Sequence, residues 1–282
     1  MPELPEVETI ACGVNARVRG QHIVQAWFCS HRQPFKTPAA RQARGLEGRA
    51  VLSVHRTGKH IVCELGPAAG GPLDKSDGQS AAQWVVHLGM TGRLLVTAPD
   101  APVAPHTHAR LSLSGGKELR FVDPRRFGRL EFRDLRRSAA FSAPGAEPLT
   151  IATEEFVALF HRRRLSIKAA LLNQALLAGV GNIYADESLF RAGIRPGKSS
   201  GRLTRAELEQ LRLSLFQVLK DAIRLGGSSV SDYVDAEGMR GFFQLEHCVY
   251  LRTGLPCLRC QTPIRRILVA GRGTHYCPKC QR

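Results

Sequence analysis

Hydrophobic and polar positions alternate along several short segments in the first half of the chain. Eight of these segments are predicted strands, at residues 22–29, 51–55, 60–65, 84–88, 93–97, 109–114, 118–122 and 129–133. The Gly115-Gly116 pair between the sixth and seventh is typical of a hairpin turn. Such regularly spaced short strands predict a β-sandwich or flattened barrel, with an initial helix over about residues 5–18 at one end.

After about residue 135 the hydrophobic period changes from two to about 3.6 residues, which indicates helices. Four helices are predicted to begin near residues 153, 167, 182 and 204. Thr153 and Asn182 are the expected N-caps of the first and third, and the second is expected to continue through Leu176. Thr204 and Glu207 form a capping box that opens the fourth and longest helix, which Gly226-Gly227 ends.

The change of period places a boundary between a β half and a helical half near residues 136–148. A cleft between two such halves is the usual place for a substrate. Within the β half, residues 66–83 are rich in Gly, Pro and Ser and are interpreted as a surface loop.

The charge balance points to a polyanionic partner. The 282 residues contain 40 Lys and Arg against 24 Asp and Glu, a formal charge of +16 with a pI near 10.2. Nucleic acid is favoured over a membrane surface, because no apolar run of about 18 residues occurs. An acidic N-terminus argues against a signal peptide, so a reducing cytoplasm is the expected compartment.

Eight cysteines in a reducing compartment argue against a disulfide framework. Four are dispersed and are expected to behave as small buried hydrophobes: Cys12, Cys29, Cys63 and Cys248. The other four form a C-x2-C-x16-C-x2-C array: Cys257, Cys260, Cys277 and Cys280. This array predicts one structural Zn²⁺ ion with no open coordination position; chance pairing or a redox Cys-x-x-Cys is the alternative.

The first residues of the chain carry candidate chemistry. If Met1 is removed, Pro2 becomes a secondary amine with a pKa near ~8, low enough to be nucleophilic at neutral pH and to form a Schiff base with a sugar aldehyde carbon. Carboxylates that could move protons follow at Glu3, Glu6 and Glu8. The alternative is structural, because Pro and acidic residues are common in the first turn of a helix.

Five stretches of the chain resemble one family, formamidopyrimidine-DNA glycosylase. They are Met1-Pro-Glu-Leu-Pro-Glu-Val-Glu-Thr9, His87-Leu-Gly-Met-Thr-Gly92, Asp123-Pro-Arg-Arg-Phe-Gly128, Gly179-Val-Gly-Asn-Ile-Tyr-Ala185 and the four-cysteine end. The resemblance runs from Pro2 to Cys280 in order. It implies an α+β protein with a β-sandwich, a helix–two-turn–helix domain and a zinc finger.

The implied domains follow the change of period. They are an N-terminal catalytic β-sandwich domain at 1–135, a linker at 136–152, a helix–two-turn–helix DNA-binding domain at 153–227, a lesion-capping loop at 228–244 and a zinc finger at 245–282. Within the loop, Tyr233, Phe242 and Phe243 are the residues that could stack on a base. No feature indicates a dimer, so a monomer is expected.

The resemblance implies a bifunctional base-excision repair enzyme that removes oxidised purines from double-stranded DNA and then cleaves the abasic site by β,δ-elimination. Pro2 corresponds to the nucleophile and Glu3 to the proton donor to the sugar ring oxygen. Glu6 matches a second acidic position that orients the site. Lys59 corresponds to a lysine that contacts phosphate and supports elimination.

Further matching positions concern the bound DNA. His87, Asn182 and Arg272 match phosphate contacts, with Arg272 also supporting the active site. Their alternative roles are a strand histidine, a helix cap and a surface arginine. Lys168 matches a lysine that handles the oxidised purine, and it could equally be a solvated charge on a helix.

A base that is flipped out of a duplex leaves a gap. Met90, Arg125 and Phe127 match the family's gap-filling residues. Phe can wedge beside the opposite base, and Arg can hydrogen-bond to the exposed edge of that base. The alternative for Met90 and Phe127 is an ordinary core position.

The chain departs from its relatives at three places. Ser231 stands where a basic residue is frequent, Thr107 occupies the centre of the usual His-Asp-His, and the 66–83 loop is longer than expected. Ser231 leaves the preferred base open. An oxidised-pyrimidine glycosylase is therefore an alternative within the enzyme class, and a non-catalytic zinc-bearing DNA-binding protein is the alternative outside it.

Overall fold

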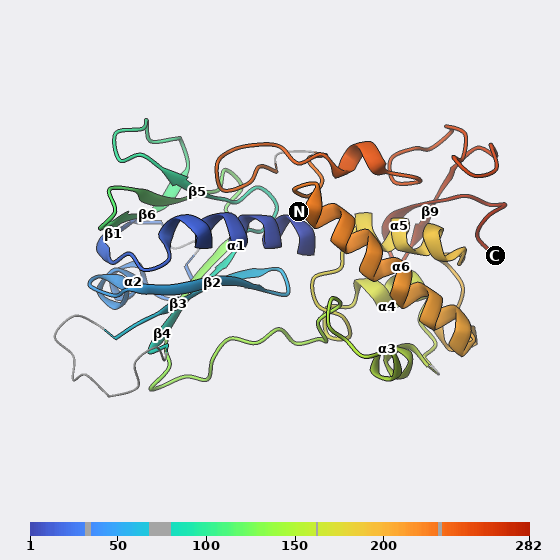
Figure 1. The fold of residues 1–282 in the computed structure, drawn as a ribbon, viewed down its shortest axis with the longest axis horizontal. Helices are drawn as coiled ribbons and strands as arrows, with labels where there is room; N and C mark the ends of the chain where they lie inside the picture. The colour runs from blue at the N-terminus through green and yellow to red at the C-terminus, as the bar shows by residue number, and fades with distance from the viewer. Residues whose placement is uncertain (32–34, 68–79, 162, 231–232) are drawn as a thin grey trace. The chain divides into compact units, whose positions relative to one another are not determined.

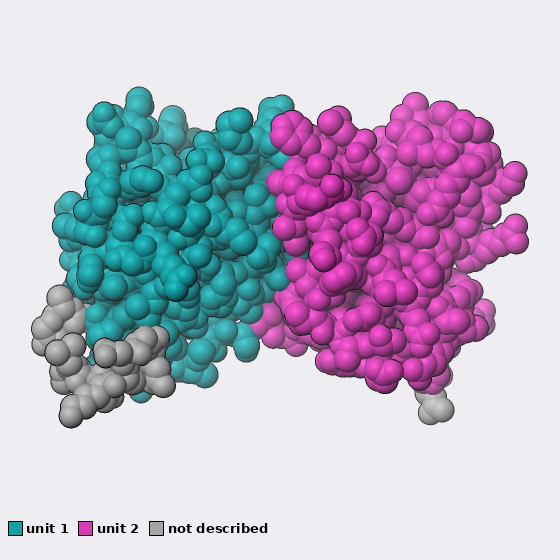
Figure 2. All heavy atoms as spheres, viewed as in Figure 1, with its two compact units in different colours: residues 1–142, 228–241 teal, residues 143–227, 242–282 magenta. Residues whose placement is uncertain are grey.

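The computed structural model of the protein describes residues 1–31, 35–67, 80–161, 163–230 and 233–282. The chain forms two compact units (Figure 2). Unit 1 comprises residues 1–142 and 228–241, and unit 2 comprises residues 143–227 and 242–282. Residue 231 and most of the 66–83 loop lie outside the described residues, so the expectations for Ser231 and for that loop stay predictions.

Unit 1 is a sandwich of two antiparallel four-stranded sheets (Figure 1). The first sheet has the order β1-β6-β7-β5, with strands Ile23–Phe28, Thr107–Leu113, Glu118–Val122 and Arg93–Thr97. The second has the order β2-β3-β4-β8, with strands Val51–Thr57, His60–Leu65, Ala82–His87 and Arg129–Asp134. All eight predicted strands are present, with ends within two residues of those expected.

Helix α1 (Leu4–Val18) packs against both sheets of unit 1. Its apolar residues recur at helical spacing and are fully buried, as Val7, Ile10, Val14 and Val18 illustrate. They join Trp84, Phe121 and the inward residues of the strands in one core. Burial of this stripe fixes the helix, and with it the N-terminus of the chain, on the sandwich.

A second helix of unit 1 is absent from the sequence-based prediction. Helix α2 (Ala39–Leu46) buries only Gln42 and Leu46, so its apolar signal is weak. The amide of Gln42 supplies the missing specificity: it donates to the carbonyl of Thr37 (2.8 Å) and accepts from Nε1 of Trp84 (3.0 Å). A buried polar side chain with such partners is a tertiary feature that hydrophobic periodicity does not reveal.

Unit 2 contains four α-helices among its described residues: α3 (Thr153–Phe160), α4 (Ile167–Leu172), α5 (Asn182–Ala192) and α6 (Arg205–Arg224). Helix α6 packs on α5 and α3. The predicted capping box is confirmed, with Thr204 as N-cap and Glu207 as its partner. Short 3₁₀ turns occur at Ser200–Arg202 and Phe243–Glu246, and strands β9 (Arg265–Val269) and β10 (Arg272–Tyr276) form a hairpin.

Three details of the helix prediction are wrong. Helices α3 and α5 begin at the expected residues, but their N-caps are Ala152 and Gly181, so Thr153 and Asn182 are already helical rather than caps. Helix α4 ends at Leu172 rather than after Leu176. The side chain of Asn173 accepts from the backbone N–H of Ala175 (3.0 Å), and such local bonds compete with the next helical turn.

The observed architecture confirms the predicted α+β class, with a β-sandwich followed by helices and a zinc-finger-like end. The boundary after residue 142 lies within the predicted linker, and the finer division into five segments stays a prediction. None of the described helices combines the length and apolar composition needed to cross a bilayer.

Candidate functional site

The N-terminus of α1 holds the candidate acid–base groups of unit 1. Glu3 is the N-cap and forms a reciprocal capping box with Glu6, whose Oε2 accepts from the backbone N–H of Glu3 at 2.8 Å. Both glutamates are buried, as is Pro2 immediately before them. With Met1 in place the Pro2 nitrogen is a peptide nitrogen, so the nucleophilic amine exists only after Met1 is removed.

Glu6 also binds the other chain segment of unit 1. Its second oxygen, Oε1, accepts from the backbone N–H of Ser228 at 2.8 Å. The hydroxyl of Tyr233 donates to the carbonyl of Glu6 (3.4 Å), and the carbonyl of Ala236 accepts from the N–H of Val96 (3.0 Å). The Glu6 carboxylate therefore joins the backbone of Glu3 to the start of residues 228–241, the later segment of the chain that belongs to unit 1.

The burial of three aromatic residues corrects one expectation. Of the three aromatic residues expected to stack on a base, Tyr233 is only 8% exposed and Phe243 is fully buried, so neither presents a free ring face. Phe242 is 60% exposed and stays a candidate. The sequence alone did not distinguish these rings, because their burial depends on contacts with distant elements.

Lys59 lies at the tip of the β2–β3 hairpin, where Gly58 adopts a positive φ and Thr57 pairs with His60. His87 ends the adjacent strand β4. Burial, followed by the charge of Lys59, lowers the pKa of His87 to about 4, so its ring is neutral at physiological pH. Its Nδ1 accepts from the N–H of Gly89 (3.2 Å), which leaves the proton on Nε2 as a donor for an anion.

Met90, Arg125 and Phe127 lie on two touching loops of unit 1. Met90 is 42% and Phe127 is 48% exposed, which rules out the alternative that they are core residues. The guanidinium carbon of Arg125 lies 4.9 Å from the centre of the Phe127 ring. Gly89 brings the loops together: its φ is +64°, and an added Cβ would lie 2.5 Å from the Phe127 backbone.

The carboxylate of Asp123 holds these loops in place, a role that the sequence analysis missed. Its Oδ1 accepts from the hydroxyl of Thr91 (2.6 Å) and the N–H of Arg125 (3.3 Å), and its Oδ2 accepts from the N–H of Gly128 (2.8 Å). Asp123 opens the Asp-Pro-Arg-Arg-Phe-Gly stretch. An acidic residue directly before a turn is the available signal, because Asp side chains commonly bond to the backbone N–H two residues further on.

A buried histidine, His108, bonds to the backbone of Asp123. Nε2 of His108 donates to the carbonyl of Asp123 (3.0 Å), so its Nδ1 accepts from the thiol of Cys29 at 3.3 Å. Burial lowers the pKa of His108 and keeps the ring neutral. Thr107, the departure from His-Asp-His, donates to the carbonyl of Ala104 (2.6 Å) and does not touch this arrangement in the described contacts.

Lys168 and Asn182 of unit 2 contact strand β10 of the β9–β10 hairpin, which begins at Arg272. Lys168 is 0% exposed, which makes the alternative of a solvated helix charge wrong. Its Nζ donates to Oγ1 of Thr274 (2.8 Å) and to the carbonyl of Gly273 (3.2 Å). Asn182, which is not a helix cap, donates from Nδ2 to the same carbonyl (3.0 Å). These bonds fix the backbone beside Arg272, whose own side chain is exposed.

Asp186 on α5 neutralises the buried Lys168. Its Oδ1 lies 2.6 Å from Lys168 Nζ, and its Oδ2 accepts from the backbone N–H of His275 at 2.8 Å. Nδ1 of His275 lies 3.2 Å from the same Oδ2. Helices α4 and α5 are thus joined to the hairpin by a buried network of charged hydrogen bonds.

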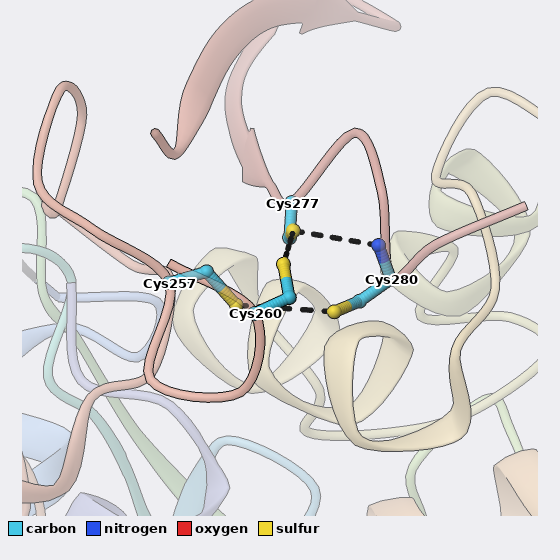
Figure 3. Close-up of side chains that lie close together, drawn as sticks. All are labelled: Cys257, Cys260, Cys277 and Cys280. Carbon is cyan, nitrogen blue, oxygen red and sulfur yellow. Dashed lines mark hydrogen bonds between the residues drawn. The ribbon is translucent and has the colours of Figure 1, made fainter. Parts of the chain in front are cut away.

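Figure 3 shows the four cysteine side chains of unit 2 gathered at one point. The sulfurs of Cys257, Cys260, Cys277 and Cys280 all lie within 4.8 Å of one another. Two of the sulfur–sulfur distances are 3.4 and 3.9 Å, close to the edges of a tetrahedron with Zn–S bonds of ~2.3 Å. The set fits one structural zinc ion, and four thiolates leave no position for substrate.

Three family models match the chain. They are the formamidopyrimidine-DNA glycosylase N-terminal domain at residues 1–130, the formamidopyrimidine-DNA glycosylase H2TH domain at 144–234, and the zinc finger found in FPG and IleRS at 254–282. The formamidopyrimidine-DNA glycosylase of Solibacter usitatus is 45% identical over 284 residues, and the two chains cover each other completely. That of Thermus thermophilus is 42% identical over 289 residues, covering 100% of this chain and 98% of the relative.

Solved structures give the same result. A Lactococcus lactis FPG mutant in complex with Fapy-dG-containing DNA has a TM-score of 0.87 at 33% identity, with full coverage of both chains. The MutM (FPG) protein of Thermus thermophilus has a TM-score of 0.82 at 40% identity, covering 99% of this chain and 98% of that one. Together, the fold, the site and these matches define a class of protein, the zinc-finger DNA glycosylases of base-excision repair. Within that class, the chain belongs to the formamidopyrimidine-DNA glycosylase family.

Proposed function

We propose that this enzyme removes oxidised purines, 8-oxoguanine and formamidopyrimidines, from duplex DNA and cleaves the resulting abasic site. The observation that carries the proposal is the start of α1, where Pro2 precedes two buried glutamates joined in a capping box. Relatives whose structures were solved with Fapy-dG-containing and abasic-site DNA support the choice of substrate. The net charge of +16 suits a DNA partner.

Excision begins with the free amine of Pro2. Its lone pair attacks C1′ of the damaged nucleotide, the bond from C1′ to the base breaks, and the base takes up the proton that the Pro2 nitrogen loses. Glu3 donates a proton to the sugar ring oxygen, so the ring opens and an iminium forms between Pro2 and C1′. Glu6 holds the backbone of Glu3 while this happens, because its carboxylate accepts from that N–H.

Strand cleavage follows from the iminium. Loss of a C2′ proton expels the 3′ phosphate in β-elimination, and a second proton loss expels the 5′ phosphate in δ-elimination. A one-nucleotide gap and a released sugar fragment remain. Lys59, at the hairpin tip, contacts a phosphate and supports these steps.

Contacts to the bent duplex come from both units. In unit 1, the Nε2–H of His87 donates to a phosphate, and the exposed Met90, Arg125 and Phe127 fill the gap left by the flipped base. In unit 2, Asn182 and Arg272 contact phosphate at the end of α5 and on the hairpin. Lys168 is buried, so its proposed part in handling the oxidised purine is indirect, through the backbone of Gly273 that it holds.

The proposed domains keep the boundaries at residues 135, 152, 227 and 244, with 228–244 as the lesion-capping loop. We expect the enzyme to act as a monomer in the bacterial cytoplasm, where the chromosome lies. All eight cysteines are free of disulfides in the structure, which is compatible with a reducing compartment.

Borohydride trapping tests the chemistry. The Met1-processed protein is incubated with a duplex containing 8-oxoguanine opposite cytosine, and borohydride reduces any iminium to a stable covalent complex. We expect trapping that disappears in Pro2→Gly and when a tag blocks the N-terminus. Binding without trapping on any lesion would leave a non-catalytic DNA-binding protein.

A second substrate class is favoured by one observation. The Lactococcus lactis FPG was also solved with DNA that contains an oxidised pyrimidine. Trapping that fails on 8-oxoguanine and succeeds on an oxidised pyrimidine would move this enzyme to that class. Relative rates on the two duplexes decide between them.

A further inference from the structure

The outer face of the second sheet of unit 1 carries a pocket of about 310 Å³. Strands β3, β4 and β8 place His60, His87 and Arg129 in one row, since His87 pairs with both of the others. Val85 and Glu131 form the next row. The alternate residues of these strands face the core, so this row points away from it.

The remaining wall of the pocket comes from Lys36, beside the edge strand β8. The N–H of Lys36 donates to the carbonyl of Leu130 at 2.9 Å, which continues the sheet by one short bridge. Lys36 then lines the pocket together with the five residues of the strands. A volume of about 310 Å³ lies at the lower end of the range for small-molecule sites.

Aromatic rings form one side of this pocket. The imidazoles of His60 and His87 lie 4.8 Å apart between ring centres, and the ring of Phe141, which is not among the lining residues, lies 4.6 Å from that of His60. Burial and neighbouring cations lower the pKa of both histidines to about 4. Neutral, ring-lined surfaces of this kind accept a planar base by stacking.

The charge of the pocket is positive. Lys36 and Arg129 contribute two cations, and Lys59 lies close enough to lower the pKa of His87. The one carboxylate, Glu131, is paired with Arg133 at 2.9 Å. An anionic group is therefore favoured between Lys36 and Arg129, while the oxygens of Glu131 suit an amino group.

We propose that this pocket binds one nucleoside 5′-monophosphate unit. Its phosphate lies between Lys36 and Arg129, its base lies against the imidazoles of His60 and His87, and an exocyclic amine of the base donates to Glu131. The unit comes either from the bound DNA strand or from a free nucleotide. Only the first source rests on the proposed function, in which His87 contacts a phosphate.

Free nucleotide binding is measured by NMR with dCMP, which carries an exocyclic amine. We expect millimolar dCMP to shift the ring signals of His60 and His87 in a saturable way. Because the phosphate favours the imidazolium form, their pKa values should also rise. Lys36→Gln should weaken binding about tenfold, since it removes one charge-assisted contact. Lys117→Gln is the matched control, because Lys117 is exposed on the β6–β7 hairpin and does not line the pocket.

Two further measurements test the base. His60→Leu should weaken the binding of dCMP and leave the binding of inorganic phosphate unchanged, because Leu keeps the bulk of the side chain and removes the ring. Thymidine monophosphate, which lacks the exocyclic amine, should bind more weakly than dCMP. Absence of saturable shifts, or equal binding of dCMP and inorganic phosphate, would overturn the nucleotide assignment.

The DNA source is tested with protein that retains Met1 and so cannot react. Lys36→Gln should weaken affinity for the 8-oxoguanine duplex relative to Lys117→Gln, while the processed variant still traps fully at saturating DNA. If the two variants bind DNA equally and dCMP still binds, the DNA source is wrong and the free nucleotide is the ligand. Loss of trapping in the wild type with intact dCMP binding would defeat the proposed function alone.

Discussion

The two units position exposed side chains in different ways. In unit 1, Arg125 and Phe127 lie on a loop that the buried carboxylate of Asp123 holds through two backbone N–H groups and one hydroxyl. In unit 2, Arg272 lies on a hairpin that Lys168 and Asp186 hold through a fully buried ion pair. The three donors to Asp123 are neutral groups, so loss of one leaves the other two in place, whereas loss of either partner of the ion pair leaves an uncompensated buried charge.

Zinc adds a second constraint to unit 2 that unit 1 lacks among its described residues. Phe190 of α5 packs with Cys257, Ile264 and Cys277, so the metal end and the helices share one small core. The hairpin that carries Arg272 is therefore held from both sides. The comparison predicts that the Arg272 hairpin of unit 2 is more sensitive to single changes than the Asp123 loop of unit 1.

Removal of zinc should have the largest effect. Structural zinc contributes about 10–16 kcal/mol in zinc-finger peptides at pH 7, so Cys260→Ser or strong chelation should unfold the C-terminal region. The circular dichroism signal of ordered secondary structure and the affinity for DNA should both decrease. The cooperative unfolding transition of unit 1 should persist. A chelated protein with intact fold and DNA binding would remove the zinc assignment.

Breaking the buried pair comes next. Lys168→Met should lower the free energy of unfolding of unit 2 by about 3–5 kcal/mol, because Asp186 is left buried without its partner. Urea denaturation followed by probes in each unit measures this. The double variant Lys168→Met, Asp186→Leu should recover much of the loss, and equal stability of single and double variants would show that the charge is not the cause.

A smaller effect is expected at the loop that Asp123 holds. Asp123→Asn keeps the shape but presents an N–H₂ group to a backbone N–H, and it should cost about 2–3 kcal/mol in the loop. Excision from duplex DNA should fall while the global unfolding midpoint changes little. Thr91→Val, which removes only one of the three bonds, is the graded control. If both variants excise at the wild-type rate, the anchoring role is wrong.

Acid should destabilise both units over the same pH range. His60 and His87 in unit 1 and His247 in unit 2 have pKa values lowered to about 4, mainly by burial. The unfolded chain binds these protons from about pH 6.5 downward and the folded chain does not, so stability is lost as pH falls from about 6.5 to 4. Each imidazole should contribute on the order of 2 kcal/mol to this loss of stability, after allowance for its partial exposure.

Denaturation at pH 7 and pH 4.5 measures this loss. His60→Gln should reduce the acid-induced loss of stability in unit 1, and His247→Gln should reduce it in unit 2. Each variant should leave the other unit's pH profile unchanged. An unaltered profile in the unit that carries the change would contradict the assignment.

Local and periodic features were determined by the sequence itself. Strand alternation placed all eight strands of the sandwich, and the Thr204–Glu207 box placed the start of α6. The cysteine spacing identified the metal ligands, since a Cys-x-x-Cys turn presents two thiolates without help from the rest of the fold. These signals work because each is a property of neighbouring residues.

Only the tertiary structure decided the remaining features. Helix α2 depends on the bond between Gln42 and Trp84, and the exposure of Met90 depends on the contact of two loops. Burial of Lys168 requires Asp186 from another helix, and burial of Tyr233 requires its return to α1. Each joins residues distant in sequence, so no local pattern carries it; long-range packing selects the partner, and the partner determines what the side chain can do.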